Sequence, residues 1–196
     1  LDKDTSGIMV FAKSAQAHKH LSRQFEARQT KKIYHAVVSG KPYPEEGLVD
    51  EPISKKMKKG AQKYIDHKNG QEAQTRYKLL KKYKDFSLLE AQPLSGRMHQ
   101  IRVHLKHLGH PLAVDPAYAL NTDGIQIKDL KKRVRYKTRP ADSEYEKTSY
   151  IINRLTLHAV SLTFIHPHSL QEMTFSAPFP KDFASLLKQL DKWNAV

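Results

Sequence analysis

The alternation of apolar and polar residues along this 196-residue chain predicts a sheet of mostly neighbouring antiparallel strands. We expect strands where the pattern alternates or stays apolar, namely at residues 7–12, 32–38, 63–66, 73–80, 86–91, 155–165 and 172–176. Asn69-Gly70 favours a tight hairpin between the third and fourth of these stretches. Pro167-His168-Ser169 favours a turn between the last two.

Three other segments have the apolar spacing of an amphipathic helix: residues 14–28, 96–108 and 181–193. Ser14 can cap the first helix, whose apolar stripe would consist of Ala17, Leu21 and Phe25. Residues 119–153 are polar and lysine-rich, so we expect an insertion or long loop there, with room for one helical turn. The whole pattern predicts an α+β fold in which helices flank a large, mixed, mainly antiparallel sheet.

Charge and composition narrow the function. The chain holds 34 Lys and Arg against 20 Asp and Glu, for a net charge of +14, which is typical of proteins that bind RNA or DNA. Its basic residues gather in three clusters, at 55–59, 81–84 and 131–137. The chain has no cysteine, which excludes a disulfide scaffold and a cysteine–zinc site and fits a cytoplasmic protein. We expect no membrane helix, because no run of 18 apolar residues occurs.

Two segments carry side chains that could do chemistry. Residues 1–7 place two carboxylates, two hydroxyls and a glycine directly before an expected strand. This pattern fits an ordinary polar turn as well as a loop that exposes one acid. Residues 94–104 are dense in Arg, His and Gln around a narrow apolar stripe. That segment fits an exposed basic helix, or a helix whose arginine pairs with a buried acid or a phosphate.

A metal site is not expected. His99, His104, His107 and His110 lie close together in the sequence, but no carboxylate lies between the first and the last. The chain also lacks a P-loop, a G-x-G-x-x-G dinucleotide motif and the flanking pattern of a nucleophile elbow. These absences disfavour nucleotide-dependent enzymes, serine hydrolases and metal-dependent nucleases.

Five segments, taken together, resemble the RluA-type RNA pseudouridine synthases and follow the order of that family. They are L-D-K-D-T-S-G at 1–7, K-K-I-Y-H-A-V-V-S-G at 31–40, the signature S-G-R-M-H-Q-I-R-V-H-L with G-H-P-L-A-V-D-P-A-Y at 95–118, R-L-T-L-H-A at 154–159 and F-S-A-P-F-P at 175–180. The resemblance implies the pseudouridine synthase fold. It also implies isomerisation of uridine to pseudouridine in ribosomal or transfer RNA, without a cofactor.

The same resemblance assigns roles to individual residues. Asp2 matches the catalytic carboxylate, and Arg102 matches the arginine that keeps this acid ionised and oriented. Tyr34 matches the active-site tyrosine, which stacks on the base and can assist removal of the C5 proton. The residues expected at the substrate are Leu157, as an apolar wall, and Arg97, His99 and Gln100 of the signature segment. Asp4 is expected to point elsewhere, because a second carboxylate would repel the first.

The chain departs from the family pattern in two places. The family has His-Arg before the residue that matches Leu1, together with an earlier segment, so we expect residues 1–196 to be a catalytic domain without its N-terminal segment. Residues 119–153 are longer than the corresponding family loop. No RNA-binding domain of the S4 type is expected in this chain, and we expect a monomer. The alternative to the enzyme is an RNA-binding module without activity.

Overall fold

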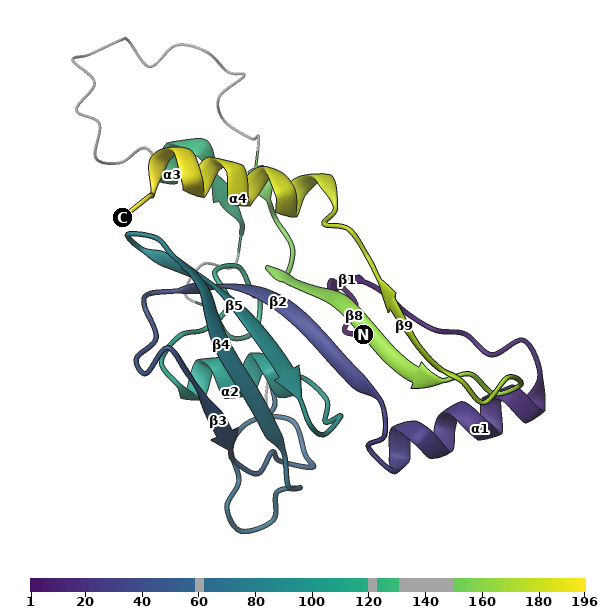
Figure 1. Cartoon of the computed structure of the whole chain (residues 1–196). Helices are drawn as coiled ribbons and strands as arrows, with labels where there is room; N and C mark the ends of the chain where they lie inside the picture. The colour runs from purple at the N-terminus through teal and green to yellow at the C-terminus, as the bar shows by residue number, and fades with distance from the viewer. Residues whose placement is uncertain (59–61, 120–122, 131–149) are drawn as a thin grey trace, which may run out of the picture.

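The computed structural model describes residues 1–58, 62–119, 123–130 and 150–196, and a seven-stranded sheet forms the centre of this part (Figure 1). The strands are β1 (Ser6–Gly7), β2 (Lys31–Ser39), β3 (Glu46–Asp50), β4 (Gln74–Lys82), β5 (Phe86–Pro93), β8 (Leu157–Ile165) and β9 (Glu172–Ser176). Their order is β1-β8-β2-β5-β4-β3, and β9 pairs with β8 beside β1. The β1–β8 pair is parallel and the others are antiparallel, which confirms the predicted fold class.

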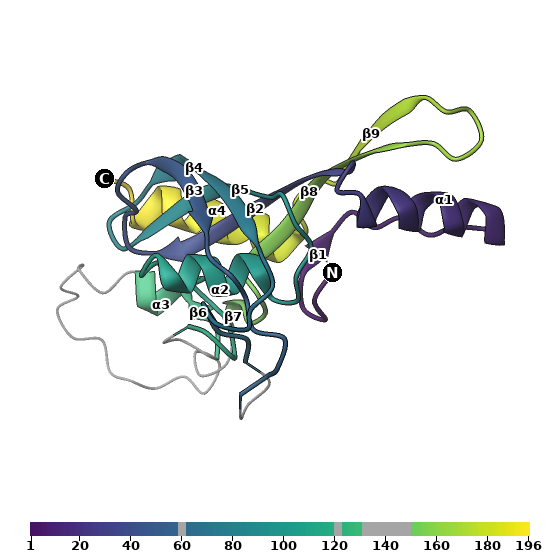
Figure 2. The same cartoon turned by 90° about the horizontal axis from the view of Figure 1, so that it is seen from below.

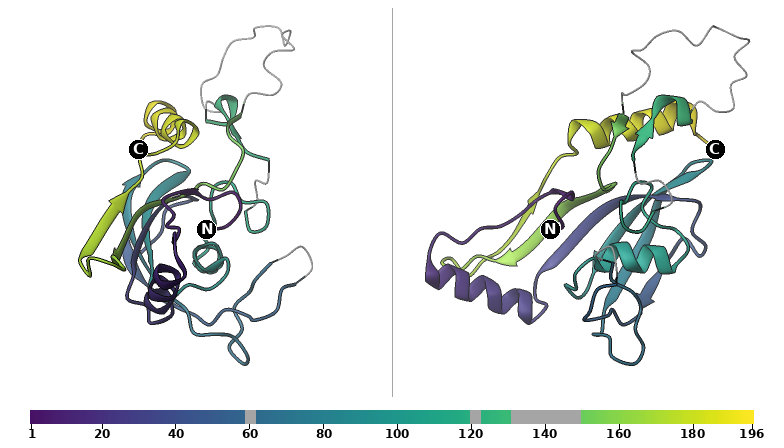
Figure 3. Two further views of the ribbon diagram at one scale, coloured as in Figure 1. Left: turned by 90° about the vertical axis from the view of Figure 1, so that its right-hand side faces the viewer. Right: turned by 180° about the vertical axis from the view of Figure 1, so that it is seen from behind.

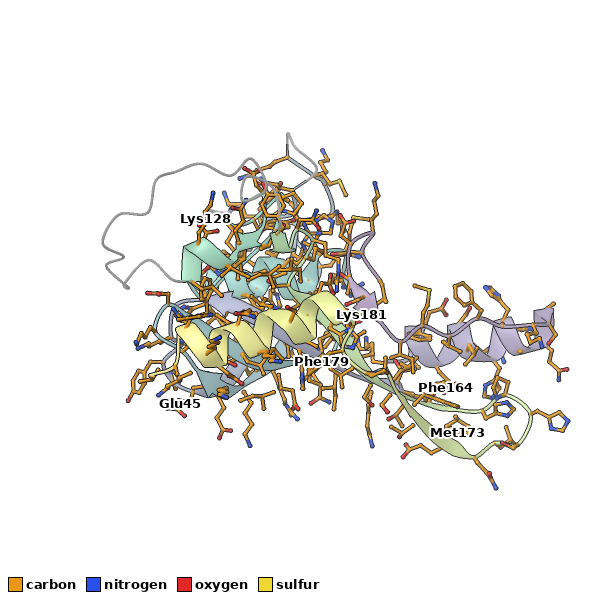
Figure 4. All side chains as sticks on the ribbon, turned by 90° about the horizontal axis from the view of Figure 1, so that it is seen from above. Glu45, Lys128, Phe164, Met173, Phe179 and Lys181 are labelled. Carbon is orange, nitrogen blue, oxygen red and sulfur yellow. The ribbon has the colours of Figure 1, made fainter. Side chains whose placement is uncertain are left out.

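Helices cover both faces of the sheet. Because successive side chains on a strand point to opposite faces, Ala36 and Val38 of β2 pack toward α2 (Gln100–His107), whereas Val37 packs toward α4 (Lys181–Trp193). α1 (Ala15–Glu26) and the β8–β9 hairpin extend together from the body as an arm (Figures 2 and 3). Phe164 and Met173 lie opposite each other on that hairpin (Figure 4).

The first predicted helix and the first predicted strand have different outcomes. α1 is confirmed, and the Ser14 hydroxyl accepts a hydrogen bond from the Ala17 N–H at 3.2 Å. The strand expected at 7–12 is wrong, because β9 pairs with β8 at Ser161–Ile165 and leaves only a two-residue pairing for β1. The chain beyond β1 crosses to α1 with alternate side chains inward, so Met9 and Phe11 are 51% and 78% exposed.

Two further predictions need correction. The helix expected from residue 96 begins only at Gln100, since the Gln100 side-chain oxygen accepts bonds from the Ser95 hydroxyl and the Arg97 N–H and stabilises a turn. No hairpin forms around Asn69, because Asp66 closes a local turn there and Ile53 bridges both flanking segments.

The helical turn expected within 119–153 is present as α3 (Ile127–Leu130), between the paired strands β6 (Ile125–Gln126) and β7 (Tyr150–Ile152). The third basic cluster lies outside the described residues.

β8 lies between the N-terminal loop and β2. Gly7 of β1 and Tyr34 of β2 are both in register with Ala159 of β8. Gly7 has a φ of 120°, and a Cβ atom at this position would lie 2.2 Å from the Ala159 carbonyl oxygen. Only glycine therefore allows the loop to approach β8 this closely.

Candidate active site

A pocket of about 430 Å³ lies where the N-terminal loop, the end of α1, β2 and the turn before α2 meet. Its lining includes every residue that the sequence placed at the site: Asp2, Tyr34, Arg97, His99, Gln100, Arg102 and Leu157. These residues come from four separate segments of the chain. Asp4 does not line the pocket and is exposed, as expected.

The Arg102 guanidinium connects two carboxylates. Its Nη1 donates to Asp2 Oδ2 at 2.9 Å, which confirms the predicted ion pair. Its Nε and Nη2 donate to the two oxygens of Asp115, each at 2.7 Å. Asp115 is fully buried and also accepts the backbone N–H groups of Ala117 and Tyr118. Asp115 therefore fixes the plane of the guanidinium, which then presents its remaining edge to Asp2.

Burial and neighbouring charges set the protonation of the site. Burial alone lowers the pKa of Arg102, but its hydrogen bonds to Asp115 and Asp2 more than offset this, so the pKa is raised and the cation persists. Burial, and then the charge of Asp2, raise the pKa of Tyr34 to about 12. Tyr34 is consequently a neutral phenol at physiological pH.

His99 and Gln100 have different surroundings. His99 has left-handed backbone geometry, with a φ of 58°, and its Nδ1 lies 2.8 Å from the Tyr118 hydroxyl. That hydroxyl also accepts a hydrogen bond from the Lys63 N–H at 2.7 Å. Burial, followed by the charge of Arg102, lowers the pKa of His99.

The amide of Gln100 is fully occupied within the protein. Its nitrogen donates to the Gln74 carbonyl and the Thr75 hydroxyl, and its oxygen accepts the two bonds of the preceding turn. Gln100 thus shapes the pocket wall, and a new bond to a substrate would break an existing buried one. Arg97 is half-buried and uses its Nε to bond the Glu72 carbonyl at 3.1 Å.

Comparison with known proteins identifies the family. The model of the family described as RNA pseudouridylate synthase matches residues 1–107. An uncharacterized RNA pseudouridine synthase of Chloroflexus aurantiacus is 37% identical over 97% of this chain and 52% of its own length. Ribosomal large subunit pseudouridine synthase D of Nitrosomonas europaea is 36% identical over 97% of this chain and 49% of its own length.

This chain belongs to the RNA pseudouridylate synthase family. The solved structure of human RNA pseudouridylate synthase domain containing 4 agrees, with a TM-score of 0.73 and 27% identity over 97% of this chain and 74% of that one. The resemblance inferred from the five motifs is therefore confirmed. The chain spans about half the length of the curated relatives it matches.

Within this family framework, the structure adds residues that the sequence did not single out. Asp115 and Tyr118 belong to the D-P-A-Y part of the signature and position Arg102, whose guanidinium lies 4.9 Å above the Tyr118 ring. The sequence does contain a signal for Asp115, which is a carboxylate inside the apolar run at 112–118. A charge buried in such a run requires a partner. Phe25 and Lys32 also line the pocket.

A second network anchors the N-terminal loop of this synthase-family chain. The Ser6 hydroxyl lies 2.9 Å from His158 Nδ1 and accepts a bond from Arg154 at 3.0 Å. Arg154 in turn holds Asp182, next to the start of α4, through two bonds of 2.7 Å. Burial lowers the pKa of His158, and its Nε2 lies 3.2 Å from the Ala177 carbonyl, which can only accept, so Nδ1 accepts a hydrogen bond from the Ser6 hydroxyl. The loop that carries Asp2 is thereby tied to β8 and α4.

The four histidines of the signature segment do not converge. His104 bonds Thr75 and the Glu51 carbonyl, whereas His110 bonds the Ser39 carbonyl. In the part of the chain that the structure describes, no three His, Asp or Glu side chains gather as a possible metal site. The helices of that part are too short or too polar to cross a membrane.

Proposed function

We propose that this chain isomerises uridine to pseudouridine in RNA, with Asp2 as the essential carboxylate. The observation that carries the proposal is the Asp2 carboxylate, held by the buried Arg102 at the edge of a pocket with apolar and aromatic walls. A flat base fits such walls, and the family of the chain supports the reaction.

The reaction breaks the N1–C1′ bond, turns the base and forms a C5–C1′ bond, while C5 loses a proton and N1 gains one. Asp2 either attacks the sugar carbon or removes a ribose proton. In both cases it must be ionised and correctly aimed. Arg102 supplies the opposing cation, and Asp115 prevents the guanidinium from rotating away.

Tyr34 and the turn before α2 complete the proposed site. The Tyr34 ring stacks on uracil, an interaction of about 1–3 kcal/mol per base. Since its pKa is about 12, its hydroxyl acts as a proton donor at rest and can take the C5 proton only by passing on its own. The His99 ring and the remaining Arg97 nitrogens line the pocket where they can contact uracil carbonyls or phosphates, and Leu157 closes the apolar side.

Ribosomal RNA is the proposed substrate, because several of the relatives, including the Nitrosomonas europaea protein, are named ribosomal large subunit pseudouridine synthases. Transfer RNA is the other expected class. In the second basic cluster, Lys81 and Lys82 form ion pairs with Asp191 and Glu45, so this cluster offers less free charge to phosphates than its sequence suggests. We propose that the protein acts as a monomer in the cytoplasm.

Tritium release from RNA labelled at uridine C5 tests the activity. Asp2→Asn should reduce release to below about 1% while RNA affinity stays within a few-fold, because the shape is kept and the reactive group is lost. Asp4→Asn is the matched control, since Asp4 is exposed and outside the pocket. Tight RNA binding by the wild type without tritium release would favour a binding module instead. Pseudouridine mapping of ribosomal and transfer RNA decides the substrate class.

A further inference from the structure

The corner between α1 and β2 places an aromatic ring and two cations beside the pocket. This α1–β2 corner consists of Phe25, Arg28 and Lys32. Phe25 is 39% exposed and lines both the active-site pocket and a neighbouring groove of about 310 Å³. It is thus a shared wall between two adjacent hollows. The groove is also lined by Val10, Ala12, His18, Leu21, Ser22 and Glu26.

Among the described residues, Lys32 is a cation without a carboxylate partner. It precedes Tyr34 by two residues on β2, and both side chains line the active-site pocket. Its Nζ donates to the Ser95 carbonyl at 3.1 Å, and no ion pair in the described part of the chain includes it. Burial, and then the charge of Arg28, lower the pKa of Lys32. An anion bound here would relieve both effects.

Arg28 occupies a backbone position that favours glycine. Its φ is 57°, and the bonds from the Arg28 N–H to the Phe25 carbonyl and from the Gln29 N–H to the Gln24 carbonyl form a Schellman motif at the end of α1. A non-glycine residue at this position costs stability. The Arg28 side chain is exposed, and its charge acts on Lys32, so both cations can face one anion.

We propose that the α1–β2 corner binds the nucleotide next to the target uridine. Phe25 stacks on the neighbouring base in the groove, while Lys32 and Arg28 hold the phosphate that joins the two nucleotides. The groove suits a base rather than a phosphate, because its walls are largely apolar and its one carboxylate, Glu26, would repel an anion. This inference rests on the proposed function, which places the target base in the adjoining pocket.

A double-mutant cycle, in which Phe25 is replaced and a neighbouring RNA base is removed, tests the stacking contact. The probe is the pentanucleotide AAUAA, compared with versions that are abasic on the 5′ or the 3′ side of the uridine. Wild-type affinity should fall on the order of tenfold for one abasic version. Phe25→Leu keeps an apolar side chain without a π face, and should lose the same factor on AAUAA with no further loss on that abasic RNA. Phe25→Tyr should behave as the wild type. Equal wild-type affinities for all three RNAs, or losses that simply multiply, would overturn the proposal.

Arg28→Gly separates a binding role from a folding role. It should raise Tm, because glycine relieves the left-handed backbone, and yet weaken AAUAA binding and flatten its salt slope by about 0.7 for one phosphate contact. Lys32→Gln should also flatten the slope, and Lys32→Arg should restore it. Unchanged affinity in Arg28→Gly and Lys32→Gln would refute the phosphate contact. Tritium release from ribosomal RNA is measured in parallel. Tritium release without coupling between Phe25 and the neighbouring base would refute only the α1–β2 corner site. Such coupling without tritium release would refute only the proposed isomerase activity.

Discussion

Asp115→Asn tests whether the buried Asp115 carboxylate positions Arg102 for its contact with Asp2. The change keeps the side-chain shape and removes the charge that faces Arg102 in two bonds of 2.7 Å. Breaking a buried ion pair costs about 3–5 kcal/mol, and we expect about 3 because Asp2 remains as a partner. For a chain of this size, that corresponds to a fall in Tm of roughly 6–12 °C. Turnover at saturating RNA should fall on the order of 100-fold, because Arg102 loses its fixed orientation.

Asp182→Asn provides the stability control. Asp182 bonds Arg154 with the same two 2.7 Å distances, but its side chain is 33% exposed, whereas that of Asp115 is fully buried. Its loss of stability, measured by urea denaturation, should be less than half as large. Equal losses in both variants would show that burial does not determine the cost. Wild-type tritium release by folded Asp115→Asn at saturating RNA would refute the positioning role.

Three other changes can be checked with the same assays. Arg102→Met should lower tritium release by more than about tenfold with RNA affinity within a few-fold, and unchanged release would contradict its role. Tyr34→Phe keeps the ring, so it should bind RNA nearly normally and turn over slowly; full turnover would leave only stacking. Burial lowers the pKa of His104 and His158, so the unfolded chain takes up these protons first as pH falls below about 6.5. The free energy of unfolding should therefore keep its full value above pH 6.5 and decrease as the pH falls below 6.5. His104→Gln should reduce this difference between pH 7.5 and 5.5, and a wild type equally stable at both would disprove the reasoning.

Elements whose pattern is local were predictable from the sequence. α1, α4 and the strands β2, β5 and β8 lie close to their expected bounds, because their side-chain periodicity reports directly on which face is buried. The stretch at 7–12 has the composition of a strand but no free edge to pair with, since β9 occupies it. Which strand takes an edge depends on residues more than 160 positions away, and no local pattern records that.

The candidate site likewise contains residues that the sequence could predict and residues whose role depends on the fold. The motifs identified Asp2, Tyr34 and Arg102, whose ion pair and common pocket the structure contains. Gln100 was expected at the substrate as part of the signature segment. It lines the pocket, and the four hydrogen bonds of its amide to other protein groups could not be predicted from the sequence. Phe25 belongs to the predicted apolar stripe of α1. A helical stripe gives the direction of a side chain but not whether a core or a pocket lies there, so its exposure required the fold.

The glycine contact at Ala159 has a consequence for how the candidate active site can vary. Gly7 and Tyr34 share one partner residue on β8, so the spacing between the acid-bearing loop and the aromatic ring is inherited from backbone pairing. A substitution at position 2 therefore leaves the backbone position of residue 34 unchanged, and a substitution at position 34 leaves that of the N-terminal loop unchanged. The vulnerable point is the frame itself. A single methyl group at position 7 would meet the Ala159 carbonyl and displace the loop that carries Asp2, although the side chains of Asp2, Tyr34 and Arg102 would all still be present.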